Sequence, residues 1–372
     1  MNSIFDPKVL AQVPPQFWTA CFFAFGCVVG SFLNVCIHRM PRDESIIHPP
    51  SHCPNCGYSI PWYLNIPLVT WLWLRGRCAN CKKEISMRYF LVEGLTGTVF
   101  ALCWLFFGHQ SPGSAVVHCV LIAGLIAATF IDFEHFIIPD EITLGGTAVG
   151  FILAFFVPSS HLSFPFFRPD QKPGPAMLDS FWGIVVGAGV VYGILRLGKL
   201  LFGRYKLVLA PGSRIFFTET ALKLPSGEMP YEDLFYRPGD TVRIEAEQVE
   251  LIDRCYKKVE LRLQPKRLRI GTDTFDPEKV LHLEAVTDHV VLPREAMGLG
   301  DVKFMAAIGA FLGWPAVLFS LALSSVIGSL TGVALIVMRK REWSARMPYG
   351  PYIAVAAVIW IFGGYKWLKL IF

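Results

Sequence analysis

Long apolar segments recur along the chain, and they constrain its fold more than any other feature. A helix needs roughly 20 apolar residues to cross the hydrocarbon core of a bilayer. Only 17% of the residues are charged, against about 25% in soluble domains. The sequence therefore predicts an α-helical multi-pass membrane protein, embedded in a lipid bilayer, with about eight transmembrane helices. The apolar segments lie near residues 17–37, 90–107, 115–131, 141–157, 180–202, 304–313, 315–338 and 349–371.

Two of these segments differ from an ordinary membrane span in their flanking sequence or their length. The first is preceded by "MNSIFDPKVLAQVPPQ", which has no basic stretch, and no small-residue cleavage site is obvious after it. We therefore read the apolar segment near residues 17–37 as a retained transmembrane helix and not as part of a signal peptide. The segment 304–313 is short, and it could instead be the first part of a broken helix.

The short loops indicate the orientation in the membrane, because cytoplasmic loops carry an excess of Lys and Arg. The loops 38–89 and 339–348 are rich in these residues, whereas the loop 108–114 has none. Eight spans then place both termini outside and the segments 38–89, 132–140, 203–303 and 339–348 in the cytoplasm. The formal net charge of +5 is modest and suits this bias better than nucleic-acid binding.

One segment does not resemble a membrane helix. From Tyr205 to Val291 apolar and polar residues alternate, as in "TVRIEAEQVEL" and "KKVELRLQPKRLRI", with turn signals such as "YRPGD" between the runs. Such alternation predicts half-buried antiparallel strands, and hence a small inserted cytoplasmic β-rich domain. Its acids and bases nearly balance, so we expect neither a nucleic-acid-binding face nor the polybasic strip of an anionic-lipid anchor.

These features predict five parts. They are an N-terminal segment with the first transmembrane helix (1–37), a cytoplasmic four-cysteine loop (38–89), transmembrane helices two to five (90–202), the inserted β-rich domain (203–291), and a final part with helices six to eight (292–372).

Four of the ten cysteines form two CxxC pairs, "CPNC" at 53–56 and "CANC" at 78–81. Two such turns supply the tetrahedral set of four thiolates that Zn²⁺ prefers. Because four thiolates leave no open coordination position, the spacing predicts a structural zinc ion held by Cys53, Cys56, Cys78 and Cys81. The alternative is a redox-active or coincidental set, and a cytoplasmic location argues against disulfides.

Two acids stand at the ends of apolar runs. Asp132 ends the third run, where a helix C-terminus disfavours an anion, and Asp301 follows Gly298 and Gly300 in "GLGDVK". Intramembrane ionisable residues are functional candidates. A carboxylate pair that shares a proton performs aspartic-protease chemistry without a metal. The alternatives are an interfacial Asp132 without a role and an N-cap role for Asp301.

Two neighbouring residues have simpler interpretations. Asp140 follows Pro139 at the start of an apolar run, which is typical of an N-cap. Lys303 is expected to contact lipid phosphates or the backbone, or to tune the acid pair, rather than to act as a nucleophile. The two glycines before Asp301 are expected to permit backbone torsions and close approaches that other residues resist.

An ordered set of motifs carries a family resemblance over nearly the whole chain except about 203–291. The "GLGDVK" stretch fits the GxGD motif of intramembrane aspartyl proteases. The set closely resembles the type IV prepilin peptidases, also called leader peptidase/N-methyltransferases. It comprises "GSFLNVCIHRMP" (30–41), the two CxxC pairs, "RYFLVEGLTG" (88–97), "IDFEHFIIPD" (131–140), "GLGDVKFMAAIGAFLGW" (298–314) and "MPYGPYIA" (347–354).

The resemblance implies a function. It places the catalytic pair on Asp132 and Asp301, in a protein of the bacterial inner membrane. The family cleaves the short basic leader of type IV prepilins or type II secretion pseudopilins after a glycine, on the cytoplasmic side. Many members then methylate the new N-terminus with S-adenosylmethionine, an activity associated with the N-terminal cytoplasmic loop. The residues that would bind this cofactor are not assigned, and Glu93 fits the family pattern without an assigned role.

The largest departure from the family pattern is the β-rich insert, which is expected to regulate the enzyme or to dock a substrate or an assembly component. Two other classes stay open from the residues alone. One is an ion-coupled transporter with a zinc-stabilised loop, because glycine-interrupted helices with acids also describe such carriers. The other is a membrane-anchored zinc-ribbon adaptor in which the acids are structural.

Overall fold

The computed structural model describes residues 14–109, 111–161, 172–202, 204–225, 227–235, 240–280, 282–293, 298–338, 347–364 and 366. Its contacts divide the chain into two compact units. The helical unit comprises Met1–Tyr192 and Leu299–Phe372, and the sheet unit comprises Gly193–Gly298.

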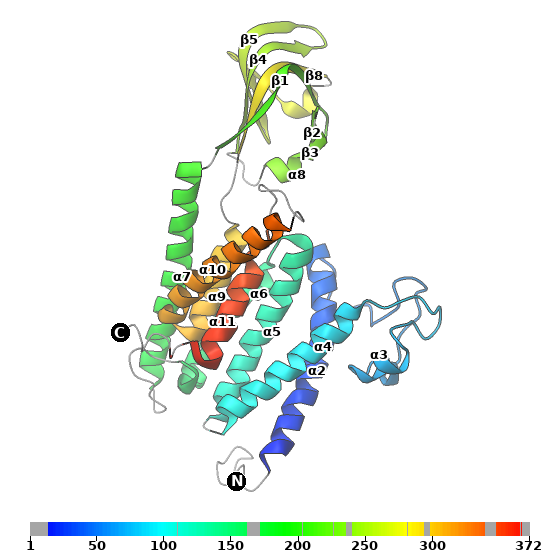
Figure 1. Cartoon of the computed structure of the whole chain (residues 1–372), viewed down its shortest axis with the longest axis vertical. Helices are drawn as coiled ribbons and strands as arrows, with labels where there is room; N and C mark the ends of the chain where they lie inside the picture. The colour runs from blue at the N-terminus through cyan, green and yellow to red at the C-terminus, as the bar shows by residue number, and fades with distance from the viewer. Residues whose placement is uncertain are drawn as a thin grey trace. The chain divides into compact units, whose positions relative to one another are not determined.

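The helical unit is built from packed helices that run through the expected apolar segments (Figure 1). Five helical stretches within the described ranges are long and apolar enough to span a membrane, namely Gln16–Arg42, Met87–Gly108, Pro112–His135, Pro173–Leu200 and Trp314–Val337. A mostly helical membrane protein is thereby confirmed, whereas the count of eight spans stays a prediction. The helices are α2 (Pro15–Arg39), α3 (Val69–Trp73), α4 (Met87–Cys103), α5 (Pro112–His135), α6 (Asp140–Phe156), α7 (Pro173–Phe202), α9 (Leu299–Leu312), α10 (Trp314–Val337) and α11 (Gly350–Ile359).

Short helical turns complete these elements. A π-helical turn, η3 (Trp104–Gly108), continues α4, and another, η6 (Trp360–Gly364), continues α11. The remaining turns are 3₁₀-helical: η1 (Met40–Arg42), η2 (Trp62–Leu64), η4 (Pro158–Ser160) and, in the sheet unit, η5 (Pro277–Lys279).

Small residues set the approach of α2 to α4. Gly26 and Gly30 are four positions apart and therefore lie on one face of α2. A Cβ on Gly26 would lie 2.8 Å from Cα of Gly97, and one on Gly30 would lie 2.7 Å from Cα of Glu93. Glycines at this spacing let membrane helices pack backbone to backbone. The four-cysteine loop between the two helices thus has firmly packed ends.

The helix that carries Asp301 is enclosed by its neighbours. From Val302 to Leu312 nearly every residue of α9 is buried, although the helix is too short to appear among the five long spans. A Cβ on Gly183 of α7 would lie 2.0 Å from the carbonyl oxygen of Gly309, and one on Gly187 would lie 2.6 Å from that of Met305. α6 also packs along α9. This burial between neighbouring helices explains why α9 is apolar and helical although it is too short to span a membrane by itself.

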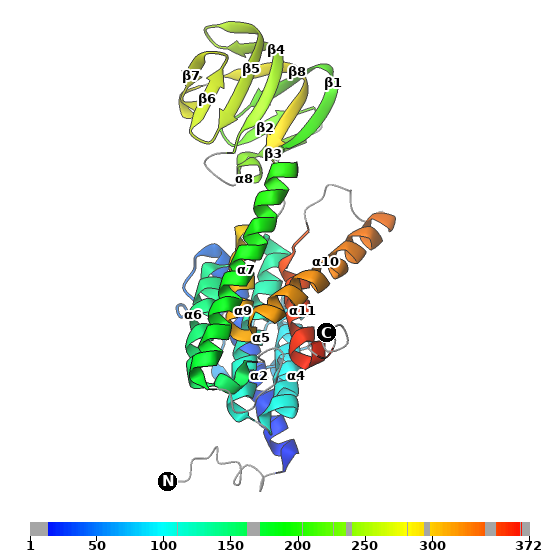
Figure 2. The same ribbon diagram turned by 90° about the vertical axis from the view of Figure 1, so that its left-hand side faces the viewer.

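The sheet unit confirms the prediction of antiparallel strands between the fifth and sixth apolar segments. Within the described residues of this unit, eight strands have the order β3-β2-β1-β8-β4-β5-β6-β7, and every pairing is antiparallel (Figure 2). A short helix, α8 (Tyr231–Leu234), follows β3. The strands are β1 (Arg204–Phe217), β2 (Ala221–Leu224), β3 (Gly227–Pro230), β4 (Val242–Leu251), β5 (Cys255–Gln264), β6 (Arg267–Ile270), β7 (Asp273–Phe275) and β8 (Leu283–Pro293).

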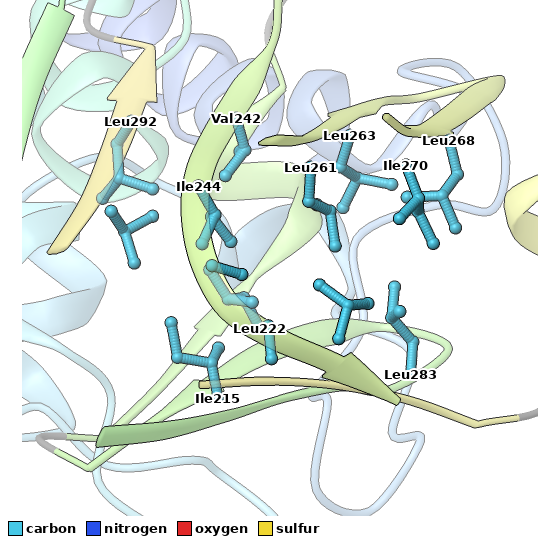
Figure 3. Close-up of a cluster of buried hydrophobic side chains, with 14 of the residues drawn as sticks. Ile215, Leu222, Val242, Ile244, Leu261, Leu263, Leu268, Ile270, Leu283 and Leu292 are labelled. Atoms are coloured by element: carbon cyan, nitrogen blue, oxygen red, sulfur yellow. The ribbon is translucent and has the colours of Figure 1, made fainter. Parts of the chain in front are cut away.

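The alternating side chains of these strands build a core that belongs to the sheet unit itself. Burying a Leu, Ile or Val side chain contributes about 1.5–3 kcal/mol, so a cluster of this size supplies the unit with its own stabilisation. The polar residues between them, such as Arg243 and Arg262, point to the other face. The labelled members in Figure 3 are Ile215, Leu222, Val242, Ile244, Leu261, Leu263, Leu268, Ile270, Leu283 and Leu292.

Candidate active site

Asp132 lies in the last turn of α5, and its side chain is buried, with 6% of the residue exposed. Phe136 ends the helix in a left-handed conformation and donates its backbone N–H to the carbonyl oxygen of Asp132. The carboxylate Oδ2 of Asp132 accepts a hydrogen bond of 2.8 Å from the backbone N–H of Gly350. Gly350 begins α11. The positive end of one helix dipole thus compensates the unfavourable place of the acid at the negative end of another.

The contact leaves no room for a side chain at position 350. A Cβ on Gly350 would lie 2.8 Å from Oδ2 of Asp132 and 3.2 Å from Cδ1 of Ile138. Both distances are tighter than ordinary van der Waals contacts. Glycine is therefore required here by the close approach of the carboxylate.

Asp301 lies in the first turn of α9 and is buried, with 9% of the residue exposed. α9 begins at Leu299, so Asp301 is inside the helix and is not its N-cap, which corrects that interpretation. A carboxylate in the first turn is favoured by the helix dipole. A buried acid at this position also needs polar surroundings or a shared proton, because an isolated buried charge is costly.

A single apolar side chain connects the surroundings of the two acids. Ile138 follows α5, and its Cδ1 lies against Gly350, the hydrogen-bond partner of Asp132. Cβ of the same Ile138 lies 3.5 Å from the position of a Cβ on Gly300, the residue before Asp301. α9 contacts both α5 and α11. The structure thus brings the Asp132 and Asp301 segments together around Ile138, although they are far apart in sequence.

Lys303 is paired with Asp140. Its Nζ lies 2.6 Å from Oδ1 and 2.9 Å from Oδ2 of Asp140. Asp140 is the first residue inside α6, and the N-cap of this helix is Pro139. The sequence interpretation of Asp140 as an N-cap is therefore wrong, because its carboxylate is used in an ion pair between α6 and α9. This partly exposed pair joins the starts of two helices beside Asp301.

The two glycines before Asp301 differ in their surroundings. Gly298 is exposed and precedes α9. A Cβ on Gly300 would be in ordinary contact with Ile138, and Gly300 has no left-handed backbone conformation. The protein's own packing therefore does not require glycine at 300, in contrast to position 350.

The four cysteines form two turns of the same construction. Cys53 and Cys78 each accept a backbone hydrogen bond at the carbonyl oxygen, from Gly57 and Lys82, and each donates one back across the turn. The four Sγ atoms lie within 4.8 Å of one another, and those of Cys53 and Cys81 are 3.8 Å apart. Zn–S bonds of about 2.3 Å in a tetrahedron separate the sulfurs by about 3.8 Å. The spacing and the donor set therefore fit a zinc ion.

Hydrogen bonds from each turn reach the sulfur atoms of the other. Nδ2 of Asn55 donates to Cys81 Sγ at 3.6 Å, and Nδ2 of Asn80 donates to Cys56 Sγ at 3.8 Å. The backbone N–H of Lys83, with the amide of Asn55, lowers the pKa of Cys81 to about 6. The thiolate form of Cys81, which binds metals, is thereby favoured at neutral pH.

Glu93 attaches the cysteine loop to α4. Its Oε2 accepts a hydrogen bond of 2.8 Å from the backbone N–H of Leu68, and Glu93 is buried, with 7% of the residue exposed. Leu68 has a positive φ of 61° and precedes α3. The aromatic residues nearby are exposed, including Trp62 at 82% and Trp73 at 74%. Such side chains suit a membrane interface.

The sequence did not identify Gly350, Ile138 or the Lys303–Asp140 pair as parts of this site. Gly350 stands in the motif "MPYGPYIA" before Pro351, and a glycine followed by proline at the start of a helix was the one available signal. The pairing of Gly350 with Asp132 depends on tertiary packing, which no local pattern contains.

Two protein-family models match the chain. The bacterial peptidase A24 N-terminal domain matches residues 24–107, which include all four cysteines. The type IV leader peptidase family matches residues 119–222 and 280–333, which include Asp132 and Asp301. The interruption between these two ranges falls within the sheet unit.

Curated relatives agree with these matches, and each is named prepilin leader peptidase/N-methyltransferase. The relative from Myxococcus xanthus is 36% identical over 232 residues, covering 56% of this chain and 68% of the relative. The relative from Aeromonas hydrophila is 27% identical, covering 94% and 93%, and that from Pseudomonas aeruginosa is 24% identical, covering 93% and 91%. No solved structure matches the chain. The chain belongs to the type IV leader peptidase family, a family of proteases.

Proposed function

We propose that this protein is a membrane-embedded aspartic endopeptidase that removes the short basic leader of type IV prepilins or type II secretion pseudopilins. Its relatives are named for the prepilin leader. The observation that carries the proposal is the placement of two buried acids, Asp132 and Asp301, on contacting helices whose ends meet at Ile138. Asp132 and Asp301 are the proposed catalytic pair.

The chemistry follows from the shared surroundings of the two carboxyl groups. Two carboxylates at close quarters cannot both ionise cheaply, so the pair holds one proton between them. The ionised member takes a proton from an attacking water, and the protonated member donates a hydrogen bond to the scissile carbonyl oxygen. The N–H of Gly350 fixes the orientation of the Asp132 carboxylate. The Lys303–Asp140 pair is proposed to hold the start of α9. Gly298 and Gly300 are proposed supporting residues of the motif that precedes Asp301.

We assign a structural role to the zinc ion that the four cysteines fit. Cys53, Cys56, Cys78 and Cys81 would hold it with no open position for a substrate or water. The ion would order a loop that has little apolar core of its own. The bonds from Asn55 and Asn80 would then join the two cysteine turns, and the anchor of Glu93 on Leu68 would fix this loop on α4.

A second activity is N-methylation of the newly exposed N-terminus of the substrate. The methyl group would come from S-adenosylmethionine, and the relatives' names include an N-methyltransferase. Presence of the four-cysteine loop supports this assignment. We assign no residue to the binding of this cofactor.

The membrane arrangement proposed here has eight spans in the bacterial inner membrane, with both termini outside and the acid pair on the cytoplasmic side. The apolar helices and the Lys- and Arg-rich loops support it. The five parts bounded at residues 37, 89, 202 and 291 are proposed as domains. The inserted sheet unit is proposed to dock a substrate or a component of the pilus or secretion assembly machinery.

Mass spectrometry of a prepilin co-expressed with the protein tests the function. We expect a mature pilin that has lost its leader after a glycine and that carries one methyl group on the new N-terminal amine. Unprocessed prepilin in cells that contain correctly inserted enzyme would refute the peptidase assignment. A cleaved but unmethylated product would refute only the second activity. A proteoliposome assay that shows ion-coupled transport instead would favour the transporter interpretation.

A further inference from the structure

The charges of the sheet unit are segregated into rows, although they nearly balance in the sequence. On the outward face, Cα pairing aligns Lys206 of β1, Val291 of β8, Arg243 of β4, Arg262 of β5 and Arg269 of β6. Four of these five positions are basic and lie on four strands of one sheet. We call this set, with Arg267, the basic row. The expectation that the insert has no polybasic strip is therefore wrong. A near balance of acidic and basic residues in the sequence does not show which side chains the strand register aligns.

The neighbouring row is acidic. Glu245 of β4 pairs with Glu260 of β5, and this pair lies two residues closer to the β4–β5 turn than the pair of Arg243 and Arg262. Glu260 accepts two hydrogen bonds from Arg262, at 2.8 and 2.7 Å. Arg262 holds the pKa of Glu260 below its usual range, and Arg243 and Arg269 add to this effect. One carboxylate thus lies among several guanidinium groups, and the basic row keeps an excess of positive charge.

Like charges directly opposite each other destabilise a sheet. The alignment of Arg243, Arg262 and Arg269 therefore lowers the stability of the sheet, and the packing of the core does not require it. The guanidinium groups line a cavity of about 190 Å³ together with the polar side chains of two neighbouring residues. Guanidinium groups bind phosphate oxygens through paired hydrogen bonds. The cavity-lining residues are Thr241, Arg243, Arg262, Gln264, Arg267 and Arg269.

The basic row lies at the end of the sheet that is tied to the membrane helix α7. Lys199, in the last turn of α7, donates a hydrogen bond of 3.0 Å to Oδ1 of the buried Asp240. Asp240 stands three residues before Arg243, and α7 is apolar enough to span a membrane up to Leu200. The opposite ends of β4 and β5, at the turn that contains Arg254, are remote from this attachment.

We propose that the basic row binds the phosphate groups of anionic phospholipids at the membrane surface where α7 ends. The positive charge, the cavity and the position of the basic row all favour this ligand, because lipid phosphates lie at the membrane surface, where a spanning helix ends. Basic side chains near such a surface are attracted within about a Debye length. Binding would hold the sheet unit against the membrane. The proposal does not depend on the peptidase assignment.

Arginine-selective labelling of the full-length protein in nanodiscs tests whether the basic row binds anionic lipid. Phenylglyoxal labelling of Arg243, Arg262 and Arg269 is measured by peptide mass spectrometry in phosphatidylcholine nanodiscs and in nanodiscs with equimolar phosphatidylglycerol. We expect phosphatidylglycerol to slow the labelling by about fivefold or more, the effect of one basic side chain at an anionic surface, and high salt to abolish the difference. Arg254, exposed at the far end of the same strands, is the internal control and should label equally.

A variant and a soluble competitor complete the test. In Arg243→Gln/Arg269→Gln, protection of Arg262 by phosphatidylglycerol should be lost, whereas Arg254→Gln should keep it. Equal labelling in the two lipids would overturn the proposal. So would protection by soluble pyrophosphate in phosphatidylcholine without any effect of phosphatidylglycerol, which would assign the cavity to a soluble phosphorylated ligand.

Discussion

The backbone N–H of Gly350 donates a hydrogen bond of 2.8 Å to Oδ2 of Asp132 across 218 positions of sequence. The bond joins the start of α11 to the end of α5. It explains how a carboxylate is tolerated at a helix C-terminus, because the N-terminus of a second helix faces it. One oxygen of Asp132 is thereby fixed, which leaves the other for chemistry.

The first prediction concerns the space at Gly350. The variant Gly350→Ala places a methyl group 2.8 Å from Oδ2 of Asp132, so the carboxylate or α11 must move. Small displacements of a catalytic group reduce rates strongly, and we expect prepilin cleavage to fall by about 10–100-fold. Gly145→Ala is the matched control, because a Cβ on Gly145 meets nothing within 4 Å. Wild-type turnover of purified Gly350→Ala would contradict this role.

The second prediction concerns the acid pair. Asn has the shape of Asp but cannot share or transfer the proton, so Asp132→Asn and Asp301→Asn should each reduce cleavage by at least about 10²–10⁴-fold. Membrane insertion should be retained in both. Glu141→Gln, at an exposed acid near the start of α6, should cleave normally. Leader removal is followed by gel shift of the co-expressed prepilin, and near wild-type processing by either Asn variant would remove that residue from the catalytic pair.

The elements were predictable where a single local pattern determines them. Apolar runs predict helices because a membrane allows few other structures, and alternation in 241–251 and 257–270 predicts strands because one face is buried. The two CxxC spacings similarly predict one four-thiolate cluster. The sulfur atoms lie within 4.8 Å of one another because each pair forms its own tight turn.

The contacts between distant elements were not predictable. Nothing near Asp132 indicates Gly350, and nothing near Lys303 indicates Asp140, because helix packing alone brings these pairs together. The basic row on the sheet was not predicted from the sequence for a related reason. A strand pairing shifted by one residue exchanges its two faces, so Arg243, Arg262 and Arg269 could be aligned only when the register was known.

The third prediction concerns the metal. We expect about one zinc ion per chain, the stoichiometry of a four-thiolate site, measured by elemental analysis of the purified protein. Cys53→Ser combined with Cys56→Ser should release it and loosen the loop, with faster proteolysis near Trp62. Cys255→Ser, on the exposed cysteine of the sheet unit, should change neither. A folded, active and metal-free wild-type sample would exclude a structural zinc ion.

The fourth prediction concerns the packing of α7 on α9. Gly183→Ala places a methyl group 2.0 Å from the carbonyl oxygen of Gly309, and both helices must separate. Overpacking of this kind costs about 1–3 kcal/mol, so the melting temperature in detergent should fall. Gly189→Ala lies on the same helix with nothing within 4 Å and should melt like the wild type. Equal melting of both variants would show that the two helices do not pack so closely.

The last prediction concerns the sheet unit. Its core is formed by its own strands and α8, and the acids of the proposed catalytic pair lie in the other unit. The entropic cost of closing a loop depends only weakly on its length, so a shorter connection should leave the acid pair in place. We therefore expect a Gly/Ser linker in place of 205–291, with "PREAMGLGD" kept, to preserve most cleavage of a minimal leader peptide. Processing of a full-length prepilin is expected to weaken if the unit docks substrates.

Two measurements decide between an accessory unit and a part of the catalytic body. Circular dichroism of the excised segment 203–293 should show a folded β structure, because its buried Ile, Leu and Val side chains need no partner outside the unit. Turnover of the minimal peptide by the shortened enzyme should stay within a few-fold of wild type. An unfolded segment, together with loss of all cleavage in a shortened enzyme that still inserts, would mean that the sheet and the helices form one catalytic body. Each unit would then require the other to fold, despite its own apolar core.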